Sequence, residues 1–376
     1  MKLWKVLGVL VALALVAAGW VVYQHDYALR EERVTIGGPE GGGGGEAAGG
    51  DPRSGGELQG GGQGSGDGLK SGGQGSGDGL KSGGLQSGGN SEGSGGELQG
   101  VLARPESGER HGLVVFVHGD GPIDATHDTF YRPLWEAFAR AGYASLSWDK
   151  PGIAGAPGNW LHQTMTDRAD EVRQAIAWAK TRPDIDPNRI GLWGASQAGW
   201  VMPAVAADTD VRFMIAVGTA VNWLRQGRYN LLAELPEGED PQAALARRES
   251  RLDLVRRRVP FDEYQRSTGD QEMTPDRWRF VLANFESDAT ADLARVTQPV
   301  LLLLGDHDRN VDVTETETTY RGLIKDVEVH RYPNATHGLT RDTNQFLLTA
   351  TAIAAPRAVF APGVLDDQVR FLERVR

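Results

Sequence analysis

The chain has 376 residues, a formal net charge of −11 and no cysteine. An acidic chain without a basic stripe is a poor match for nucleic acid, whose phosphates are neutralised by clustered lysine and arginine. Without cysteine the chain has no disulfide, no thiol nucleophile and no thiolate metal site. The sequence shows neither a metal-binding cluster nor a nucleotide-binding loop, so we expect no metal and no cofactor.

The amino terminus has the order of a membrane-targeting segment. Lys2 and Lys5 precede an uncharged apolar run over Val6–Tyr23. This run is long enough for a short transmembrane helix, and it also matches a signal peptide. We expect residues 1–24 to be a membrane anchor or a cleaved signal peptide. The positive-inside rule then places the rest of the chain in the cell envelope, facing the periplasm if it is anchored and secreted if it is cleaved.

Glycine dominates the next segment. An eleven-residue unit, GGQGSGDGLKS, occupies residues 61–71 and is repeated at 72–82. Such a stretch has little to bury and loses much backbone entropy on ordering, so we predict a disordered linker over 25–96. A flexible chain of this length spans roughly 40–45 Å, which would hold a catalytic domain clear of a membrane.

From residue 97 onward, apolar runs alternate with segments of helical spacing. The run Leu113–Val117 is continuously apolar, as a strand buried on both faces should be. Further strands are predicted at 144–148, 190–193, 213–217, 300–304 and 327–332, and helices at 131–141, 166–180, from 197 onward and at 365–375. This alternation predicts an α/β domain over 97–376, with a mostly parallel sheet and helices on both faces.

One interval interrupts the alternation. Between Val217 and Val300 the chain is polar, helical in pattern and rich in arginine and glutamate. We therefore predict a helical cap over about 220–296, near the carboxyl edge of the sheet, where such sheets bind ligands. Its aromatic residues are candidates for lining a substrate pocket or for packing within the cap. They are Trp223, Tyr229, Tyr264, Trp278 and Phe285.

The segment Gly194–Gly199 lies between a predicted strand and a predicted helix. A strained strand-to-helix turn that exposes a nucleophile needs small residues two positions before and after it, here Gly194 and Ala198. The hydroxyl of Ser196 would then project at the amino end of a helix, where N–H groups favour developing negative charge. We predict that Ser196 is a catalytic nucleophile; the alternative is a simple helix cap.

The segment His118–Pro122 ends the first strong strand in a glycine-rich turn. Such a turn allows main-chain N–H groups to point at an oxyanion. We predict that the N–H groups of Asp120 and Gly121, together with that of Gln197, form an oxyanion hole. We expect His118, immediately before the turn, to be structural.

An acid and a base follow further along the chain. The loop after the strand at 300–304 holds two carboxylates; its spacing favours Asp308 as the acid and leaves Asp306 as a turn former or helper. His337 lies in a loop after the last strand, from which it can reach the serine, whereas His307 shares a tight loop with the acids. Serine, acid and histidine occur in the order typical of one large hydrolase fold. We predict that Asp308 and His337 complete the triad.

With these motifs in place, residues 97–376 resemble the α/β-hydrolase superfamily. Within it they are similar to bacterial esterase-like serine hydrolases with an HGxGP turn, an Asp-Lys-Pro-Gly loop and a GxSQxG elbow, here His118–Pro122, Asp149–Gly152 and Gly194–Gly199. The resemblance implies hydrolysis of a small-molecule carboxylic ester or thioester through an acyl-serine. The strands that usually open this sheet are replaced by the glycine-rich tract, so the sheet either lacks its outermost strand or takes one from Arg33–Ile36.

Three alternatives stay open. A peptidase of the prolyl-oligopeptidase type uses the same triad order, and an acyltransferase uses the same intermediate. From another class, the chain is a non-catalytic, tethered binding protein on a hydrolase fold. The presence of serine, aspartate and histidine in the correct order favours an enzyme.

Overall fold

The computed structural model of the protein describes residues 19–37, 96–108 and 110–376. Residues 1–18, which hold most of the predicted anchor or signal peptide, lie outside these ranges, as does most of the glycine-rich tract. Within the described residues no helix combines the length and the apolar character needed to cross a bilayer.

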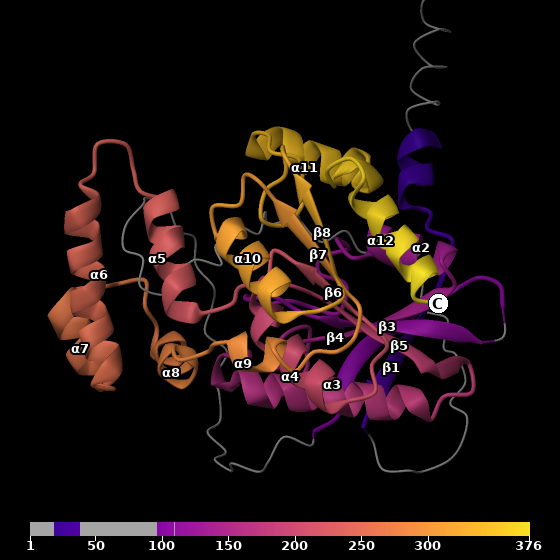
Figure 1. Ribbon diagram of the computed structural model, residues 1–376, viewed down its shortest axis with the longest axis horizontal. Coiled ribbons are helices and arrows are strands. Elements are labelled where there is room, and N and C mark those ends of the chain that lie inside the picture. The colour runs from indigo at the N-terminus through magenta and orange to yellow at the C-terminus, as the bar shows by residue number, and fades with distance from the viewer. Residues whose placement is uncertain (1–18, 38–95, 109) are drawn as a thin grey trace, which may run out of the picture.

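An eight-stranded sheet forms the centre of the molecule (Figure 1). The strands are β1 (Leu29–Ile36), β2 (Leu98–Pro105), β3 (His111–Val117), β4 (Tyr143–Trp148), β5 (Ile185–Ala195), β6 (Met214–Val217), β7 (Val300–Gly305) and β8 (Val327–Tyr332). Their order is β1-β2-β4-β3-β5-β6-β7-β8. The pairs β1–β2 and β2–β4 are antiparallel, and the other pairs are parallel.

Helices cover both faces of the sheet. The α-helices are α2 (Arg132–Arg140), α3 (Met165–Lys180), α4 (Met202–Asp208), α5 (Trp223–Ala233), α6 (Pro241–Arg256), α7 (Phe261–Thr268), α8 (Pro275–Asn284), α9 (Thr290–Leu293), α10 (Val313–Leu323), α11 (Gln345–Ala354) and α12 (Val364–Arg374). Short 3-10 turns are η1 (Trp160–His162), η2 (Ser196–Trp200) and η3 (Pro356–Ala358). Residues of α3, α4 and α10 share one apolar core, and residues of α2 and α12 share the other. The predicted α/β-hydrolase fold class is confirmed.

The central strand β3 shows why its sequence is continuously apolar. Leu113, Val115 and Val117 belong to the core on one face of the sheet, and Val114 and Phe116 belong to the core on the other. Successive side chains of a strand point to opposite faces, so a strand with helices on both sides needs apolar residues at every position.

The edge of the sheet is built from residues that precede the glycine-rich tract. Strand β1 pairs with β2, with Ile36 opposite Leu98, and both Val34 and Ile36 are buried. The sheet therefore takes its outer strand from the amino-terminal side, one of the two possibilities that the sequence left open. The folded domain begins at Leu29 rather than at residue 97. The glycine-rich tract connects β1 to β2, which pair with each other. The residues of β1 therefore belong to the folded domain although they precede the tract.

The helix expected from residue 197 is divided in two. The turn η2 ends at Trp200, and the regular helix α4 begins at Met202 with Pro203 in its first turn. Proline has no N–H to donate and its ring crowds the carbonyl four residues earlier, so one continuous helix through this position is unfavourable. The serine thus stands on a short turn of its own.

Five helices, α5–α9, connect β6 to β7, and the structure describes no named strand between them. The helices α5–α8 extend from one side of the sheet (Figure 1). Two further helices were not predicted. They are α10, which follows the loop of Asp308, and α11, a stretch without a charged residue.

Candidate active site

Ser196 is the first residue of η2, directly after β5, and its φ of 54° lies in the left-handed region that non-glycine residues rarely adopt. The small neighbours have a direct steric cause. A Cβ on Gly194 would lie 2.6 Å from Cβ of Ala198 and 2.9 Å from Sδ of Met202, and one on Gly199 would lie 2.4 Å from the carbonyl oxygen of Ala220. Glycine and alanine therefore allow the strained turn to exist.

Asp308 and His337 form a partly buried pair. Nδ1 of His337 lies 2.7 Å from Oδ2 of Asp308, whose side chain is fully buried. The other carboxylate oxygen accepts the N–H groups of Asn310 and Val311 at 2.7 and 2.8 Å. The hydroxyl of Tyr229 on α5 donates to the Asp308 carbonyl at 2.7 Å. The acid is therefore held in one orientation and directs its free oxygen at the imidazole.

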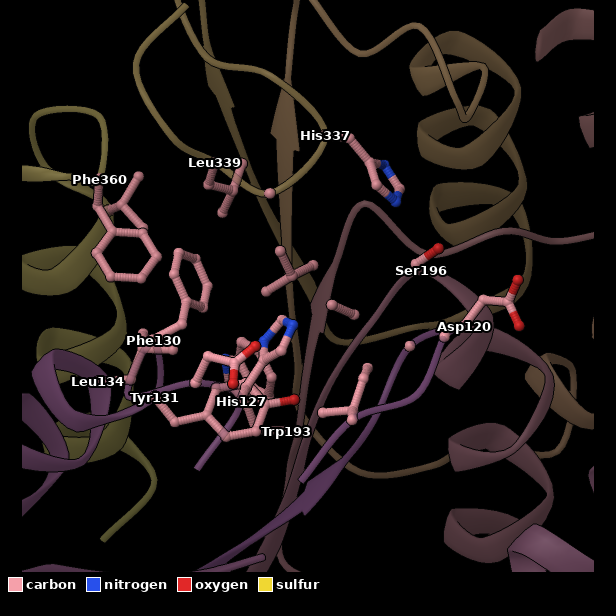
Figure 2. A pocket seen from close by; sticks show the side chains of 18 of the residues that line it. Asp120, His127, Phe130, Tyr131, Leu134, Trp193, Ser196, His337, Leu339 and Phe360 are labelled. Atoms are coloured by element: carbon pink, nitrogen blue, oxygen red, sulfur yellow. The ribbon is translucent and has the colours of Figure 1, made fainter. Parts of the chain in front are cut away.

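The second imidazole nitrogen of His337 lies on the side of the ring that faces Ser196 (Figure 2). Nε2 of His337 is buried and has no hydrogen-bond partner within the described residues. Figure 2 shows the ring pointing toward Ser196. Burial by itself lowers the pKa of His337, but the charge of the Asp308 carboxylate and its hydrogen bond outweigh burial, so the pKa lies above its ordinary value of 6.5.

The glycine-rich turn lies next to the serine. A Cβ on Gly119 would lie 3.5 Å from Cβ of Ser196 and 3.4 Å from the Ala195 carbonyl oxygen. Of the three predicted oxyanion donors, the N–H of Gly121 contributes to lowering the pKa of the Asp120 carboxyl. Gln197, another predicted donor, lies in the first turn of η2, where main-chain N–H groups have no partner within the helix.

Three cationic side chains support this turn, and sequence reasoning assigned none of them a role. Nζ of Lys150 donates to the carbonyls of Gly119 and Gly121 at 2.6 and 2.8 Å. Arg168 donates to the side chain of Gln197 and to the His118 carbonyl. Arg277 on α8 binds the Asp120 carboxylate through both terminal nitrogens, at 3.1 and 2.8 Å. The only signal for this support was the Asp149–Gly152 motif, which contains Lys150.

The charges in this cluster respond to burial and to one another. Burial raises the pKa of the Asp120 carboxyl, but the charge and hydrogen bond of Arg277 outweigh burial, so the pKa lies below its usual range. Burial, together with the charge of Arg168, holds the pKa of Lys150 well below its ordinary value. The turn thus depends on a charged contact from the cap.

The other candidate residues have different partners. His118 is buried between the Tyr131 hydroxyl and the Trp148 carbonyl, at 2.9 and 2.6 Å, and burial holds its pKa well below the ordinary value. His307 pairs with Asp342, and Asp306 pairs with Arg331. The structure therefore brings together Ser196, Asp308 and His337 and excludes their competitors from the site.

A cavity of about 350 Å³ begins at the serine. Gly119, Asp120, Ser196 and His337 line its catalytic end. Apolar side chains line most of the rest (Figure 2), mainly those of Phe130, Leu134, Trp193, Leu339 and Phe360. Polar side chains line the remainder, namely those of His127, Asp128, Tyr131 and Gln368. The cavity therefore lies between the sheet and the side covered by α2 and α12.

The cap aromatics do not line this cavity. Tyr264 and Trp278 stack on each other at 4.2 Å, and Trp223 stacks on Trp200 at 5.1 Å. They complete the core of the cap, because flat aromatic rings bury large areas against one another. Among the described residues no group of histidine, aspartate or glutamate has a metal-binding arrangement.

Two known proteins are similar in sequence to parts of this chain. The chain is 24% identical over 257 residues to the uncharacterized peptidase YuxL of Bacillus subtilis, a match that covers 65% of this chain and 34% of that protein. It is 29% identical over 113 residues to an uncharacterized 31.7 kDa protein of Escherichia coli, covering 30% of this chain and 38% of that protein. The chain thus spans little more than a third of the length of these relatives.

Among solved structures, an esterase of Pyrococcus furiosus aligns with 74% of this chain and 86% of its own, at 17% identity and a TM-score of 0.47. The family model described as serine aminopeptidase, S33, matches residues 108–344. That range is more than half of the chain and contains Ser196, Asp308 and His337. The chain belongs to the S33 serine aminopeptidase family of α/β hydrolases.

Proposed function

We propose that this protein is a serine hydrolase that cleaves a carboxylic ester or thioester with an apolar acyl group through an acyl-serine intermediate. One observation carries the proposal. The Asp308–His337 pair presents a buried Nε2, which has no partner within the described residues, toward a strained serine at the end of a mainly apolar cavity. A strained nucleophile, an oriented base and a desolvated acyl site are the components of nucleophilic acyl transfer.

The proposed reaction has two stages. His337 Nε2 accepts the proton of the Ser196 hydroxyl as the oxygen bonds to the acyl carbon, and Asp308 stabilises the imidazolium that forms. The N–H groups of Asp120 and Gln197 hold the tetrahedral oxyanion, and the departing alkoxide or thiolate takes the proton from His337. Water then attacks the acyl-serine with His337 again as base, which releases the carboxylic acid and restores the serine.

The cavity supports an apolar acyl group rather than a charged one. Its volume of about 350 Å³ lies at the lower end of the range for small-ligand sites. The polar side chains at its catalytic end have partners: Asp120 pairs with Arg277, and His337 pairs with Asp308. An alkyl or aryl acyl chain would release water from the side chains of Phe130, Leu134 and Phe360, which favours binding.

The second candidate is a peptidase. The family description and the name of the Bacillus subtilis relative are both those of peptidases, and the triad chemistry is the same. The apolar lining favours the ester. An acyltransferase and a non-catalytic binding protein are the further alternatives, which turnover with water as acceptor would exclude.

We also propose that the protein acts in the cell envelope. This rests on the basic and apolar order of residues 1–24 in the sequence. A fusion reporter that is active only outside the cytoplasm tests this placement.

The test compares nitrophenyl esters of increasing chain length, acyl thioesters and aminoacyl nitroanilides, using the full chain. We expect ester or thioester turnover to fall by about 10⁴-fold or more in Ser196→Ala, as for other nucleophile substitutions. Ser250→Ala on α6, which removes an exposed hydroxyl, is the matched control. If Ser196→Ala retained most of the activity, or if only nitroanilides were cleaved, the proposed function would be wrong.

A further inference from the structure

Among the described residues, the large apolar side chains that are exposed lie in two segments of the chain. They are Trp20, Val21, Val22 and Tyr23 near the amino terminus, and Phe346, Leu347 and Ile353 on α11. Phe346 is 83% exposed and Val22 68%. The ten residues of α11 include no charge and no buried residue. A soluble surface rarely gathers its large apolar side chains in this way unless another phase or partner covers them.

The two segments form a single face because specific contacts join them. Nε2 of His25 lies 2.7 Å from the carbonyl oxygen of Ile353, at the end of α11. Arg357, just after α11, donates to the carbonyls of Tyr23 and Asp26 at 2.8 and 2.9 Å. Its guanidinium also lies over the ring of Tyr27 at 4.6 Å. Figure 1 shows α11 and the helical stretch before β1 on the same side of the molecule.

Arg357 is itself fixed to the domain. It pairs with Glu136 on α2 through two nitrogens, at 2.6 and 2.7 Å. The contacts therefore run from residues 23–26 through Arg357 to a helix of the main fold. The amino-terminal segment and α11 are positioned together relative to the sheet.

The direction of the chain indicates what covers this face. The sequence before Trp20 is uncharged and apolar back to Val6. Only residues 24–28 lie between the end of that run and β1. A bilayer that receives this run must therefore lie next to the residues that contact α11. Trp20 and Tyr23 are residue types enriched at the membrane interface.

We propose that residues 20–23 and α11 form one face that docks on the surface of a lipid bilayer, so that the hydrolase domain lies against the membrane. α11 acts as an interfacial helix, with its apolar side chains among the outer parts of the acyl chains. The glycine-rich tract does not hold the domain away from the membrane, because it connects β1 to β2 and both strands belong to the domain.

The face also bears on substrate delivery, a step that rests on the proposed function. The chain segment that carries α11 starts and ends at the wall of the cavity, where Thr340 and Phe360 form a bridge and Leu339 and Phe360 line the cavity. A docked α11 places that wall close to the bilayer. Acyl esters dissolved in the membrane are then the substrates nearest to Ser196.

A single labelled cysteine tests the docking directly. Because the natural chain has no cysteine, Phe346→Cys in the full-length protein gives a unique site for an environment-sensitive fluorophore. Ala246→Cys, at an exposed position of α6, is the matched control. The proteins are reconstituted in phosphatidylcholine–phosphatidylglycerol vesicles with or without brominated acyl chains. We expect the label at 346 to shift to shorter wavelength and to be quenched by the brominated lipid, and the label at 246 to do neither.

Two outcomes would overturn the proposal. Equal quenching at both positions would show that contact with lipid is not specific to α11. No quenching at 346 would show that α11 does not meet the lipid, and a blue shift without quenching would then indicate that a second copy or another part of this chain covers the face. Neither outcome depends on enzymatic activity, so the proposal and the proposed function fail separately.

A second measurement concerns delivery. The variant with Phe346→Ser, Leu347→Ser and Ile353→Ser is compared with the wild type on a short, water-soluble ester and on a long-chain ester embedded in vesicles. We expect unchanged turnover of the soluble ester and a several-fold loss with the embedded one. Equal turnover of the embedded ester would contradict the role of the face in delivery.

Discussion

At the scale of single residues, the proposed reaction depends on one proton, that of His337. The imidazole acts as a base only when it is neutral, and Asp308 stabilises its charged form. The same contact that orients the ring thus raises the pH at which the enzyme becomes active. Activity on esters is expected to appear on the alkaline side of the histidine pKa.

The pH dependence of kcat/KM reports this pKa in the free enzyme. Because the pKa of His337 is raised, we expect the acidic limb of the profile to have its midpoint above 6.5. In Asp308→Asn the limb should move to lower pH, since the favourable charge is lost, while activity at the plateau falls by about 10⁴-fold. An acidic limb that does not move in this variant would contradict the assigned partnership. Asp306→Asn, in the same loop, is the control.

A neighbouring glycine, Gly218, leaves the space that the Asp308–His337 pair occupies. Gly218 has a φ of 49°, and a Cβ there would lie 3.2 Å from Nδ1 of His337 and 3.3 Å from Oδ2 of Asp308. We expect Gly218→Ala to reduce kcat by about 10², as small displacements of catalytic groups do. Gly322→Ala on α10, where a Cβ meets no atom within 4 Å, should leave kcat unchanged. Measured kcat values for the two variants check this, and equal values would refute the steric argument.

At the scale of elements, the cap and the oxyanion turn are coupled through one ion pair. Arg277 on α8 holds the largely buried carboxylate of Asp120, whose own N–H is a proposed oxyanion donor. The turn also rests on Lys150 and Arg168 from the main fold. Movement of α8 would therefore change the geometry of the turn, and in the proposed reaction the cap would influence the rate without lining the cavity.

Replacing Arg277 tests this coupling. In Arg277→Met the Asp120 carboxylate stays buried without its main partner, so the pKa of Asp120 should rise and the turn should shift. We expect kcat to fall by between about tenfold and the 10²–10³ that follows loss of a whole oxyanion donor, with a smaller change in KM. Arg279→Met, exposed on the same helix, is the control. A change in KM alone would show that Arg277 serves substrate binding rather than the turn.

At the scale of the whole molecule, the sheet joins two parts of the chain that are far apart in sequence. Ile36 and Leu98 are direct neighbours across the β1–β2 pair, and Gln174 on α3 donates to the carbonyls of Ile36 and Gly96. Everything between them is an insertion at one end of a hairpin. The candidate catalytic residues Ser196, Asp308 and His337 follow other strands of the sheet, β5, β7 and β8.

We therefore expect that residues 38–95 can be replaced by Asn-Gly without loss of the fold, because this leaves a hairpin loop of ordinary length. The shorter loop should raise the free energy of unfolding by up to about 2 kcal/mol through its smaller closure entropy. Denaturant unfolding measures the free energy of unfolding, and nitrophenyl ester turnover shows whether the fold is retained. Removal of β1 as well should destabilise the domain, since Val34 and Ile36 each contribute roughly 1.5–3 kcal/mol by burial. A variant that unfolds when only 38–95 is replaced would contradict the hairpin argument.

The sequence by itself determined the fold class and the identity of the catalytic candidates. Strands buried on both faces must be continuously apolar, as in β3, and a strained elbow must have small residues on both sides of Ser196. These are local requirements that appear as local patterns. The same reasoning singled out Asp308 and His337, which the structure brings within 2.7 Å of each other.

Only the tertiary structure decided the rest, because each remaining feature joins residues that are distant in sequence. The cavity combines side chains of α2, β5 and the segment around Phe360, and the contact of Arg277 with Asp120 spans the cap. Strand β1 pairs across the glycine-rich tract, so composition alone placed the domain boundary too late. The apolar character of α11 is visible in its sequence, but its exposure and its contact with residue 25 are not. Pairing, burial and exposure are properties of the folded chain, and they determine where this hydrolase domain meets its surroundings.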